Sequence, residues 1–282
     1  MFIQEHSKEH AIARLCEALE VSESGFYGWR DRDPSKREID NIRLVRLIEK
    51  FHRASGEIYG SPKIHADLLD DGVSCSKNKV ARLMQRHGIQ SKLRRKFVIT
   101  TDSKSTHSPS PDLLKRNFQV NEPDTHWVSD TTFIQTRQGW VYLAVIVDLF
   151  SRAVVGWSMG NKNDAQLVCE ALKNAVLCRQ PKPGLILHSD QGSTYASSKY
   201  QALVKENKLI CSMARKGECL DNAVAESFFG SLKNEWVYHE DYKTRTEARQ
   251  SVFKYIEVFY NRKRRHAFLD YKAPFEFEQC AA

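Results

Sequence analysis

The sequence lacks the long apolar runs and leader segments that mark membrane and secreted proteins. Its longest apolar run, residues 141–147, is far shorter than the ~18 residues that a membrane-spanning helix needs. The first ten residues, MFIQEHSKEH, are too polar for a secretory signal peptide. We therefore expect a soluble, cytoplasmic protein with no membrane association.

Paired cysteines and two catalytic signatures are also missing. The seven cysteines are odd in number and irregularly spaced, with no C-x-x-C pair. This pattern indicates reduced thiols rather than a disulfide framework or a zinc site. There is no G-x-x-x-x-G-K-[ST] loop for nucleotide phosphates, and no histidine stands at the H-x-x-R spacing that tyrosine recombinases use. Nucleotide hydrolysis and a tyrosine nucleophile of that kind are not expected.

Positive charge is in excess. The 282 residues suffice for one large domain and a smaller one. The 43 Lys and Arg against 35 Asp and Glu leave a formal net charge of +8. Such a balance favours a polyanionic partner, nucleic acid first, although many basic proteins gain solubility in the same way.

The first third of the chain is predicted to be helical. Residues 1–34 are predicted to form a short helical pair, and Ser22 can cap the second helix, which carries Phe26 and Trp29. The first helix of the pair has its apolar residues at helical spacing: Ile12, Leu15, Cys16 and Leu19. A third helix follows, with an apolar stripe predicted at Ile42, Val45, Ile48 and Phe51.

Residues 35–92 are predicted to contain a helix-turn-helix. Ser61 offers a capping hydroxyl before Pro62 at a helix start, and Ser76 can cap the next helix. In that second helix three apolar residues face one side and three basic residues the other: Val80, Leu83 and Met84 against Lys79, Arg82 and Arg86. This suits a helix that reads the major groove of DNA, or alternatively a helical hairpin with a solvated basic face.

A basic linker, 93–118, divides the chain, and its Arg94 and Arg95 are candidates for phosphate contacts. Beyond it we expect an α/β core over 119–240, continued by a C-terminal helix and basic tail over 241–282. The core pattern is β-β-β-α-β-α-β, which predicts a mixed sheet with helices on both faces. The predicted strands are 126–135, 140–150, 152–159, 184–188 and 209–213, and the predicted helices between them are 163–177 and 197–206.

Three acidic residues stand out in this core. Asp130 lies within the first strand, Asp190 follows the fourth, and Glu226 lies near the start of a helix that Asp221 is predicted to cap. Taken singly, each acid is explained by a salt bridge or a helix cap. Together, three carboxylates from separate elements suit a hard divalent ion such as Mg²⁺, and two such ions can clamp a phosphoryl displacement.

The helix that carries Glu226 has two distinct stripes. Val224, Phe228 and Leu232 form an apolar stripe, whereas Glu226, Gly230 and Lys233 form a second one. A carboxylate, a glycine and a lysine on one face can accept a closely approaching phosphate backbone.

The spacing of these acids resembles a known pattern. Asp190 and Glu226 have 35 residues between them, as in the D,D(35)E pattern of transposases and retroviral integrases. The segments WVSDTTFIQT, YLAVIVDLFSRAVVGWSM, LHSDQGSTY and MARKGECLDNAVAESFFGSLKNE resemble the catalytic core of insertion elements whose transposase is read from two overlapping frames. VSESGFYGW, YGSPKIHADL and YNRKRRHAFLDYKAPFEFE resemble its flanking segments, and the chain looks like the second-frame (OrfB) product.

The resemblance implies an RNase H-like, mixed five-stranded sheet behind an all-α helix-turn-helix region. It implies Asp130, Asp190 and Glu226 as ligands of two Mg²⁺ or Mn²⁺ ions, with Lys233 as the basic residue that the superfamily places seven positions after its glutamate. The implied partners are DNA (terminal inverted repeats and target), a first-frame product or fusion with it, and further copies of the chain, in association with the nucleoid. One departure is Asp270, where the family usually has glycine.

Weaker candidates complete the set. His188 is two residues before Asp190 and could orient a water or phosphate, or make a structural hydrogen bond. Arg215 and Lys216 either hold DNA or belong to a solvated loop. Arg264 and Arg265, in the run NRKRRH, either bind phosphates or act against the dipole at a helix end.

The leading hypothesis is therefore a DNA transposase that cuts and joins strands by metal-dependent phosphoryl transfer. A metal-dependent nuclease without joining activity is one alternative. The other is a non-catalytic DNA-binding regulator formed from a partial transposase frame.

Overall fold

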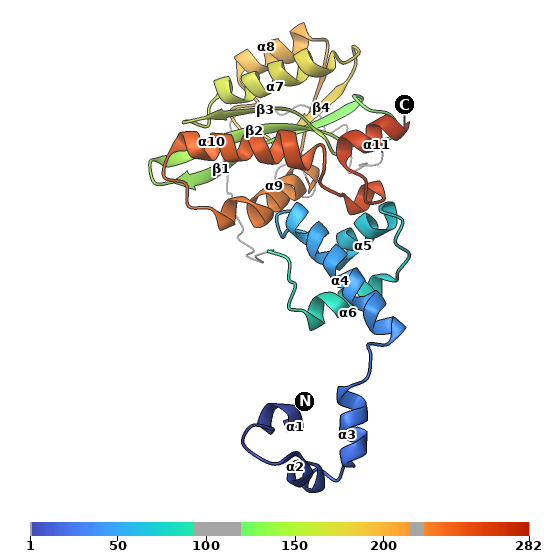
Figure 1. Cartoon of the computed structure of the whole chain (residues 1–282). Coiled ribbons are helices and arrows are strands. Elements are labelled where there is room, and N and C mark those ends of the chain that lie inside the picture. The colour runs from blue at the N-terminus through green and yellow to red at the C-terminus, as the bar shows by residue number, and fades with distance from the viewer. Residues whose placement is uncertain (1, 93–119, 215–222, 282) are drawn as a thin grey trace.

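The computed structural model describes residues 2–92, 120–214 and 223–281. Its N-terminal part is a small unit of three helices, α1 (Phe2–His6), α2 (Ile12–Ala18) and α3 (Glu23–Arg30). Ser22 caps α3 as predicted, because its hydroxyl accepts the Gly25 N–H. Of the two aromatic residues that this helix carries, Phe26 is buried and Trp29 is 46% exposed. The unit lies apart from the other elements and is joined to them through an extended stretch (Figure 1).

The long helix α4 (Lys36–Ala54) begins in a capping box formed by Ser35 and Glu38. Its buried residues are Leu44, Val45, Ile48 and His52. Ile42, predicted on the buried stripe, is 50% exposed. That prediction was wrong because steps of three residues drift by about 60° per step around a helix with 3.6 residues per turn.

The predicted helix-turn-helix is present as α5 (Ser61–Asp70) and α6 (Lys77–Arg86). Ser76 caps α6, but Ser61 does not cap α5: it is the first helical residue, and the extended Gly60 holds the cap position. The three apolar residues predicted to face inward from α6 are all buried: Val80, Leu83 and Met84. Gly72 in the turn and Gly88 after α6 both have positive φ.

The core of the protein is a mixed five-stranded sheet. Its strands are β1 (His126–Thr136), β2 (Gly139–Asp148), β3 (Val154–Gly160), β4 (Ile186–Ser189) and β5 (Ile210–Met213). They lie in the order β3-β2-β1-β4-β5. β1, β2 and β3 pair antiparallel, whereas β4 is parallel to β1 and β5 to β4. β2 and β4 are interior strands, and β1 lies at the centre.

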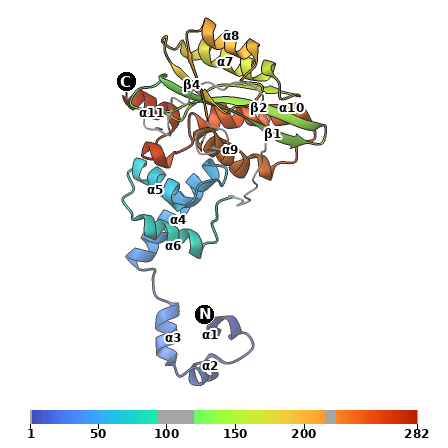
Figure 2. The ribbon, with the colours of Figure 1, turned by 180° about the vertical axis from the view of Figure 1, so that it is seen from behind.

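Helices cover both faces of this sheet, as expected (Figures 1 and 2). On one face lie α7 (Ala165–Arg179) and α8 (Ser198–Glu206), and on the other α9 (Ala223–Glu235) and α10 (Arg245–Phe253). The strand side chains divide accordingly: Ala144 and Ile146 belong to the α7 core, and Leu143 and Val145 to the α9 core. α7 packs so closely on β3 that a Cβ at Gly156 would lie 2.5 Å from the Ala175 side chain. The predicted RNase H-like architecture is therefore confirmed.

The C-terminal segment completes the α9 face. Its remaining elements are the 3-10 turns η2 (Val237–His239) and η4 (Ala267–Leu269), the π-helical η3 (Lys254–Tyr260), and α11 (Pro274–Ala281), which the sequence did not predict. Asp270 has a φ of 50°, in the left-handed region where glycine is favoured. The family's usual glycine at this position is thus explained by the backbone, and aspartate is one of the side chains that tolerate it.

Within the described ranges, no helix has both the length and the apolar character to cross a membrane.

Candidate active site

Two of the predicted carboxylates lie on neighbouring parallel strands. Asp130 lies on β1, and Asp190 directly follows β4, which pairs with β1. Each is oriented by a backbone amide: Asp130 accepts the Thr131 N–H at 2.7 Å, and Asp190 the Gly192 N–H at 2.8 Å. Burial raises the pKa of Asp190, and the hydrogen bond from Gly192 opposes this rise.

The third carboxylate, Glu226, is exposed in the first turn of α9, the helix that packs on β1. The charges of the other two acids both act on Asp130. Burial is the largest cause of the rise in the pKa of Asp130 to about 8, and the charges of Asp190 and then Glu226 contribute to the same rise. Asp130 is thus close enough to both other acids to be affected by their charges.

Lys233 belongs to the same environment. Burial lowers its pKa, and the charge of Asp130 acts in the opposite direction. Its ammonium lies 5.0 Å from the centre of the Phe133 ring on β1. Between it and Glu226, a Cβ at Gly230 would meet nothing within 4 Å among the described residues, so with respect to these residues this face of α9 is open. The opposite stripe is packed as predicted, with Phe228 and Leu232 buried.

The donor set fits a hard divalent cation, because carboxylate oxygens are the ligands that Mg²⁺ prefers. Over the described parts of the chain, however, no group of three or more His, Cys, Asp or Glu side chains lies close enough together to hold a metal ion. The charges of the acids influence Asp130, but in this arrangement the three carboxylates are not close enough together to coordinate one metal ion.

His188 is fully buried, and its Nδ1 lies 2.9 Å from the Ser212 hydroxyl on β5. This contact ties β4 to β5 directly before Asp190. His188 is therefore a buried residue that holds the strand before Asp190 against β5, and it does not lie on the surface of the site.

The basic residues predicted to bind DNA are found in different situations. On α6, Arg82 and Arg86 are exposed, and Lys79 is partly so. Four other predicted contacts, together with the predicted cap Asp221, lie outside the described residues: Arg94, Arg95, Arg215 and Lys216.

Arg264 and Arg265 are engaged within the protein. Arg264 is buried and donates two hydrogen bonds of 2.6 Å to the Glu235 carboxylate. Arg265 donates to Asp67 at 2.6 Å and also pairs with Asp70. These intramolecular pairs explain the two charges without DNA, and we do not place either residue on the DNA surface.

Sequence reasoning missed Glu235 altogether. It is the last residue of α9 and is only 5% exposed. A signal was present, because a carboxylate at a helix C-terminus opposes the helix dipole and suggests a cationic partner elsewhere.

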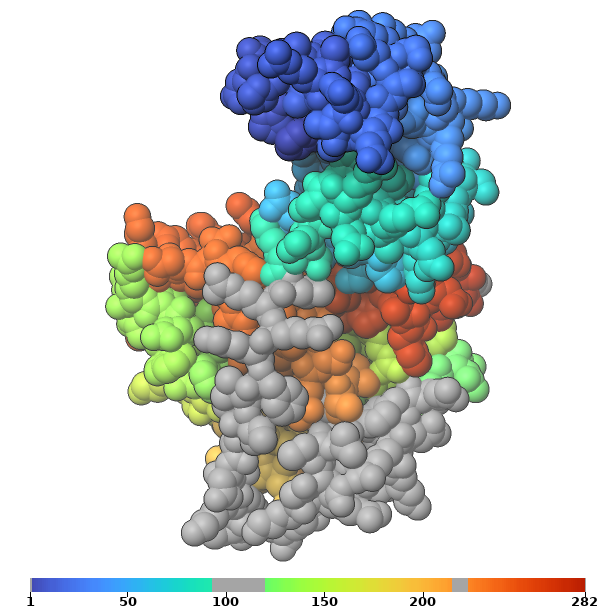
Figure 3. Space-filling view, turned by 90° about the horizontal axis from the view of Figure 1, so that it is seen from below, coloured from blue at the N-terminus to red at the C-terminus, as the bar shows by residue number. Residues whose placement is uncertain are grey.

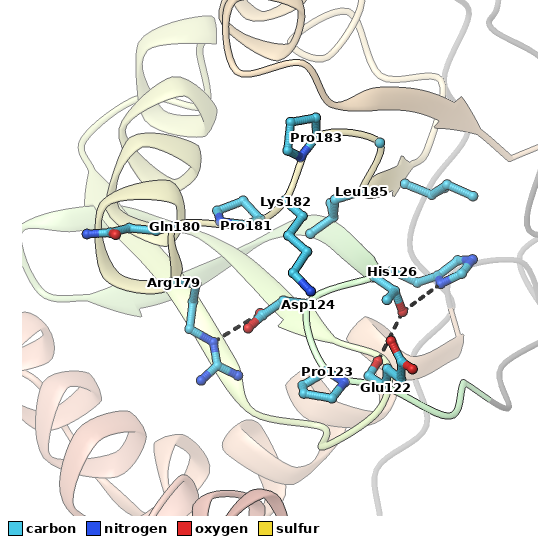
Figure 4. A pocket seen from close by; sticks show the side chains of 13 residues that line it. Glu122, Pro123, Asp124, His126, Arg179, Gln180, Pro181, Lys182, Pro183 and Leu185 are labelled. Atoms are coloured by element: carbon cyan, nitrogen blue, oxygen red, sulfur yellow. Dashed lines mark hydrogen bonds and ion pairs between the residues drawn. The ribbon is translucent and has the colours of Figure 1, made fainter. Parts of the chain in front are cut away.

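A separate hollow of about 590 Å³ lies at the other end of the parallel strands (Figure 4). It is lined by 122–126, where β1 begins, and by 179–186, where α7 ends and β4 begins. Arg179 spans it and pairs with Asp124. The predicted carboxylates lie instead within β1 and beyond the carboxyl end of β4, so this hollow is no part of the candidate site.

Three domain families match parts of the chain. An HTH-like domain family matches residues 38–97, and two integrase core domain families match 120–219 and 226–281. Among solved structures, a chain of the simian T-cell lymphotropic virus intasome in complex with PP2A regulatory subunit B56 gamma has 14% identity and a TM-score of 0.47, over 82% of this chain and 74% of that one. The HTLV-2 integrase catalytic core domain in complex with magnesium has 18% identity and a TM-score of 0.42, over 55% and 97%.

The sequence relatives are much nearer. Transposase InsF for insertion sequence IS3A of Escherichia coli is 37% identical over 99% of this chain and 97% of its own length. A 31 kDa protein of insertion element IS600 from Shigella sonnei is also 37% identical, over 94% and 97%. Identity at this level over nearly the full length shows that the chain belongs to the IS3-type insertion-sequence transposases, with an integrase core behind an HTH-like domain.

Proposed function

We propose that the protein cuts and joins DNA strands by phosphoryl transfer with divalent metal ions held by Asp130, Asp190 and Glu226. The observation that carries the proposal is their placement: β1 bears Asp130, Asp190 directly follows its parallel neighbour β4, and Glu226 lies in the first turn of α9, which packs on β1. The charges of Asp190 and Glu226 that act on Asp130 support it, since like charges gathered in one place favour a cation there.

Mg²⁺ or Mn²⁺ at these carboxylates, as two ions, would activate a water and then a 3′-hydroxyl, and would stabilise charge on the attacked phosphate. The side chains supply orientation and counter-charge. The Thr131 and Gly192 amides fix Asp130 and Asp190, as described above. Lys233 can neutralise a phosphate next to the one attacked, and the open face at Gly230 lets the DNA backbone approach α9.

For DNA recognition we propose the exposed basic face of α6, with Lys79, Arg82 and Arg86 on phosphates or base edges. The DNA would carry the terminal inverted repeats of the element, followed by a target duplex. Joining needs both ends held together, so we propose more than one copy of the chain on DNA, assisted by a first-frame product.

The test is a cleavage and joining assay on DNA with the repeats that flank the gene, in Mg²⁺ and in Mn²⁺. Wild type should nick and join, whereas Glu226→Gln should bind the same DNA without cutting it. Glu206→Gln, an exposed glutamate on α8, is the matched control and should retain activity.

Other results would favour other functions. Cutting without joining would indicate a nuclease. Binding without cutting in wild type, even after the first-frame product is added, would indicate a regulator.

A further inference from the structure

Helix α5 turns charged side chains toward the catalytic core. Lys63 and Asp67 are one turn apart and therefore share a face of the helix. The Lys63 ammonium lies 3.5 Å from a Glu235 carboxylate oxygen, and Asp67 accepts a hydrogen bond of 2.6 Å from Arg265. The side chains of Lys63 and Asp67 are only 19% and 16% exposed. These are contacts between the HTH-like region and the C-terminal part of the core.

Glu235 is the centre of the first contact. Its carboxylate accepts hydrogen bonds from Arg264 and, at 3.0 Å, from the Tyr255 hydroxyl, in addition to the Lys63 ion pair. Arg264 also donates to Ser231, one turn earlier on α9. Two basic side chains, one from each region, thus share a single buried carboxylate.

Tyr59, just before α5, makes the second contact. Its hydroxyl donates to the Lys263 carbonyl at 2.9 Å and accepts the Arg265 N–H at 2.8 Å. Its ring lies 6.3 Å from that of Phe259. Two segments nearly 200 residues apart, 59–67 and 259–265, therefore form one continuous interface. In Figure 3 the surface of α4–α6 lies directly against the orange and red surface of the C-terminal part.

We propose that Lys63 and Asp67 are positioning residues: through Glu235 and Arg265 they hold the HTH-like region in one orientation relative to the helix that carries Glu226. The inference rests on the proposed function, because orientation matters only if DNA bound by one region is cut by the other. In this proposal α5 docks the HTH-like region on the core, and α6 remains free to bind the DNA.

The geometry favours positioning over simple adhesion. Glu235 and Glu226 are nine residues apart on one helix, about 13.5 Å at 1.5 Å per residue, so a constraint on one end of α9 is passed to the other. A hydrogen-bonded charged pair allows only a few relative orientations of the two regions it joins, whereas apolar contacts alone would allow many. Arg82 and Arg86 remain exposed on α6. A DNA end bound there is thereby held at a set distance from the carboxylates.

The first experiment measures orientation without DNA or catalysis. Spin labels are introduced as unnatural amino acids at Ile42 and Leu177, which are 50% and 76% exposed in the two regions. Their distance distribution is recorded in the full chain for wild type and for Lys63→Met/Asp67→Asn. The matched control is Lys92→Met, since the Lys92–Glu57 ion pair lies within the HTH-like region. If the double variant does not fold, the distance distribution is recorded for Lys63→Met alone.

We expect a narrow distribution in wild type and in the control, and a broad one in the double variant. The distance distribution of Lys63→Arg, which keeps the charge, should stay narrow. An unchanged distribution in the double variant would overturn the inference.

The second experiment maps the cut phosphodiesters on repeat-bearing DNA. In the double variant, affinity for the repeat should be unchanged, whereas cutting at the main position should fall about tenfold or more, with new cuts beside it. A single cut position at the wild-type rate would contradict the inference. If wild type does not cut even after the first-frame product is added, the proposed function fails, and the distance distribution alone decides whether the two regions are held by these residues.

Discussion

The Glu235 carboxylate accepts two hydrogen bonds from the Arg264 guanidinium, each 2.6 Å long, at the C-terminal end of α9. Both side chains are buried. The pair explains how a carboxylate can end this helix against the dipole, and it places Arg264 of the basic run inside the protein. Because neither charge has ready access to water, the stability of the fold should depend on keeping both.

Replacement of Glu235 by glutamine should therefore lower the free energy of unfolding by about 3–5 kcal/mol, since Arg264 would remain buried without its counter-charge. Urea unfolding measures this, with Glu206→Gln as a control that should change little. Burial alone would raise the pKa of Glu235, but Arg264 lowers it below the ordinary 4.5. The contribution is thus present above pH 4.5 and lost as the pH falls further. The difference between wild type and Glu235→Gln should shrink below pH 4.5, and a constant difference would contradict this account.

Replacement of Asp130 by asparagine should stabilise the metal-free protein at neutral pH by roughly 1 kcal/mol. Because the pKa of Asp130 is raised to about 8 in the folded protein, a carboxyl that is ionised in the unfolded chain at this pH must bind a proton on folding, and asparagine removes that cost. Thermal unfolding without metal tests this. Added Mg²⁺ should raise the melting temperature of wild type but not of the variant, since a ligand stabilises only the state that binds it. Equal Mg²⁺ shifts in both proteins would argue against Asp130 as a ligand.

Gly230→Ala separates folding from DNA approach. Alanine is the better helix former by up to about 1 kcal/mol, and outside its own helix its Cβ would meet none of the described residues within 4 Å, so the variant should be at least as stable as wild type. If the phosphate backbone approaches this face, cleavage should nevertheless fall. Full activity in a stabilised variant would show that DNA does not come close to Gly230. Unfolding and cleavage are measured on the same preparation.

The exposed arginines of α6 should contribute to DNA binding through phosphates. Removal of one side chain that neutralises a phosphate should lower the slope of log affinity against log salt by about 0.9. Arg82→Gln/Arg86→Gln should thus bind more weakly and lose up to about two units of slope. Titrations at several salt concentrations measure this. Arg53→Gln, an exposed arginine paired with Glu49 on α4, should behave as wild type.

Local signals in the sequence predicted the elements well. The predicted caps at Ser22 and Ser76 are correct because a capping hydroxyl acts within three residues of its own position. The strands followed from apolar runs and their flanking residues. Errors came where two local interpretations competed: Ser61 stands beside Gly60 at the start of α5, and the stripe through Ile42 drifts off the buried face of α4.

The three acids could be singled out from sequence because each has a distinctive local setting and a fixed spacing. Arg264 and Arg265 could not be interpreted in the same way. A run of basic residues looks the same whether it meets phosphates or buried carboxylates, and Glu235 and Asp67 are 29 and 198 positions away from them in the chain.

The sequence by itself determined the helix caps at Ser22 and Ser76, the mixed sheet with helices on both faces, and the family pattern of Asp130, Asp190 and Glu226. Each of these depends on neighbours along the chain or on a fixed spacing. The tertiary structure alone decided which charges are paired: Lys63 with Glu235, and Arg265 with Asp67. The physical reason is that a charge is neutralised by whatever lies near it in space, and packing of the core on α5 sets that neighbour.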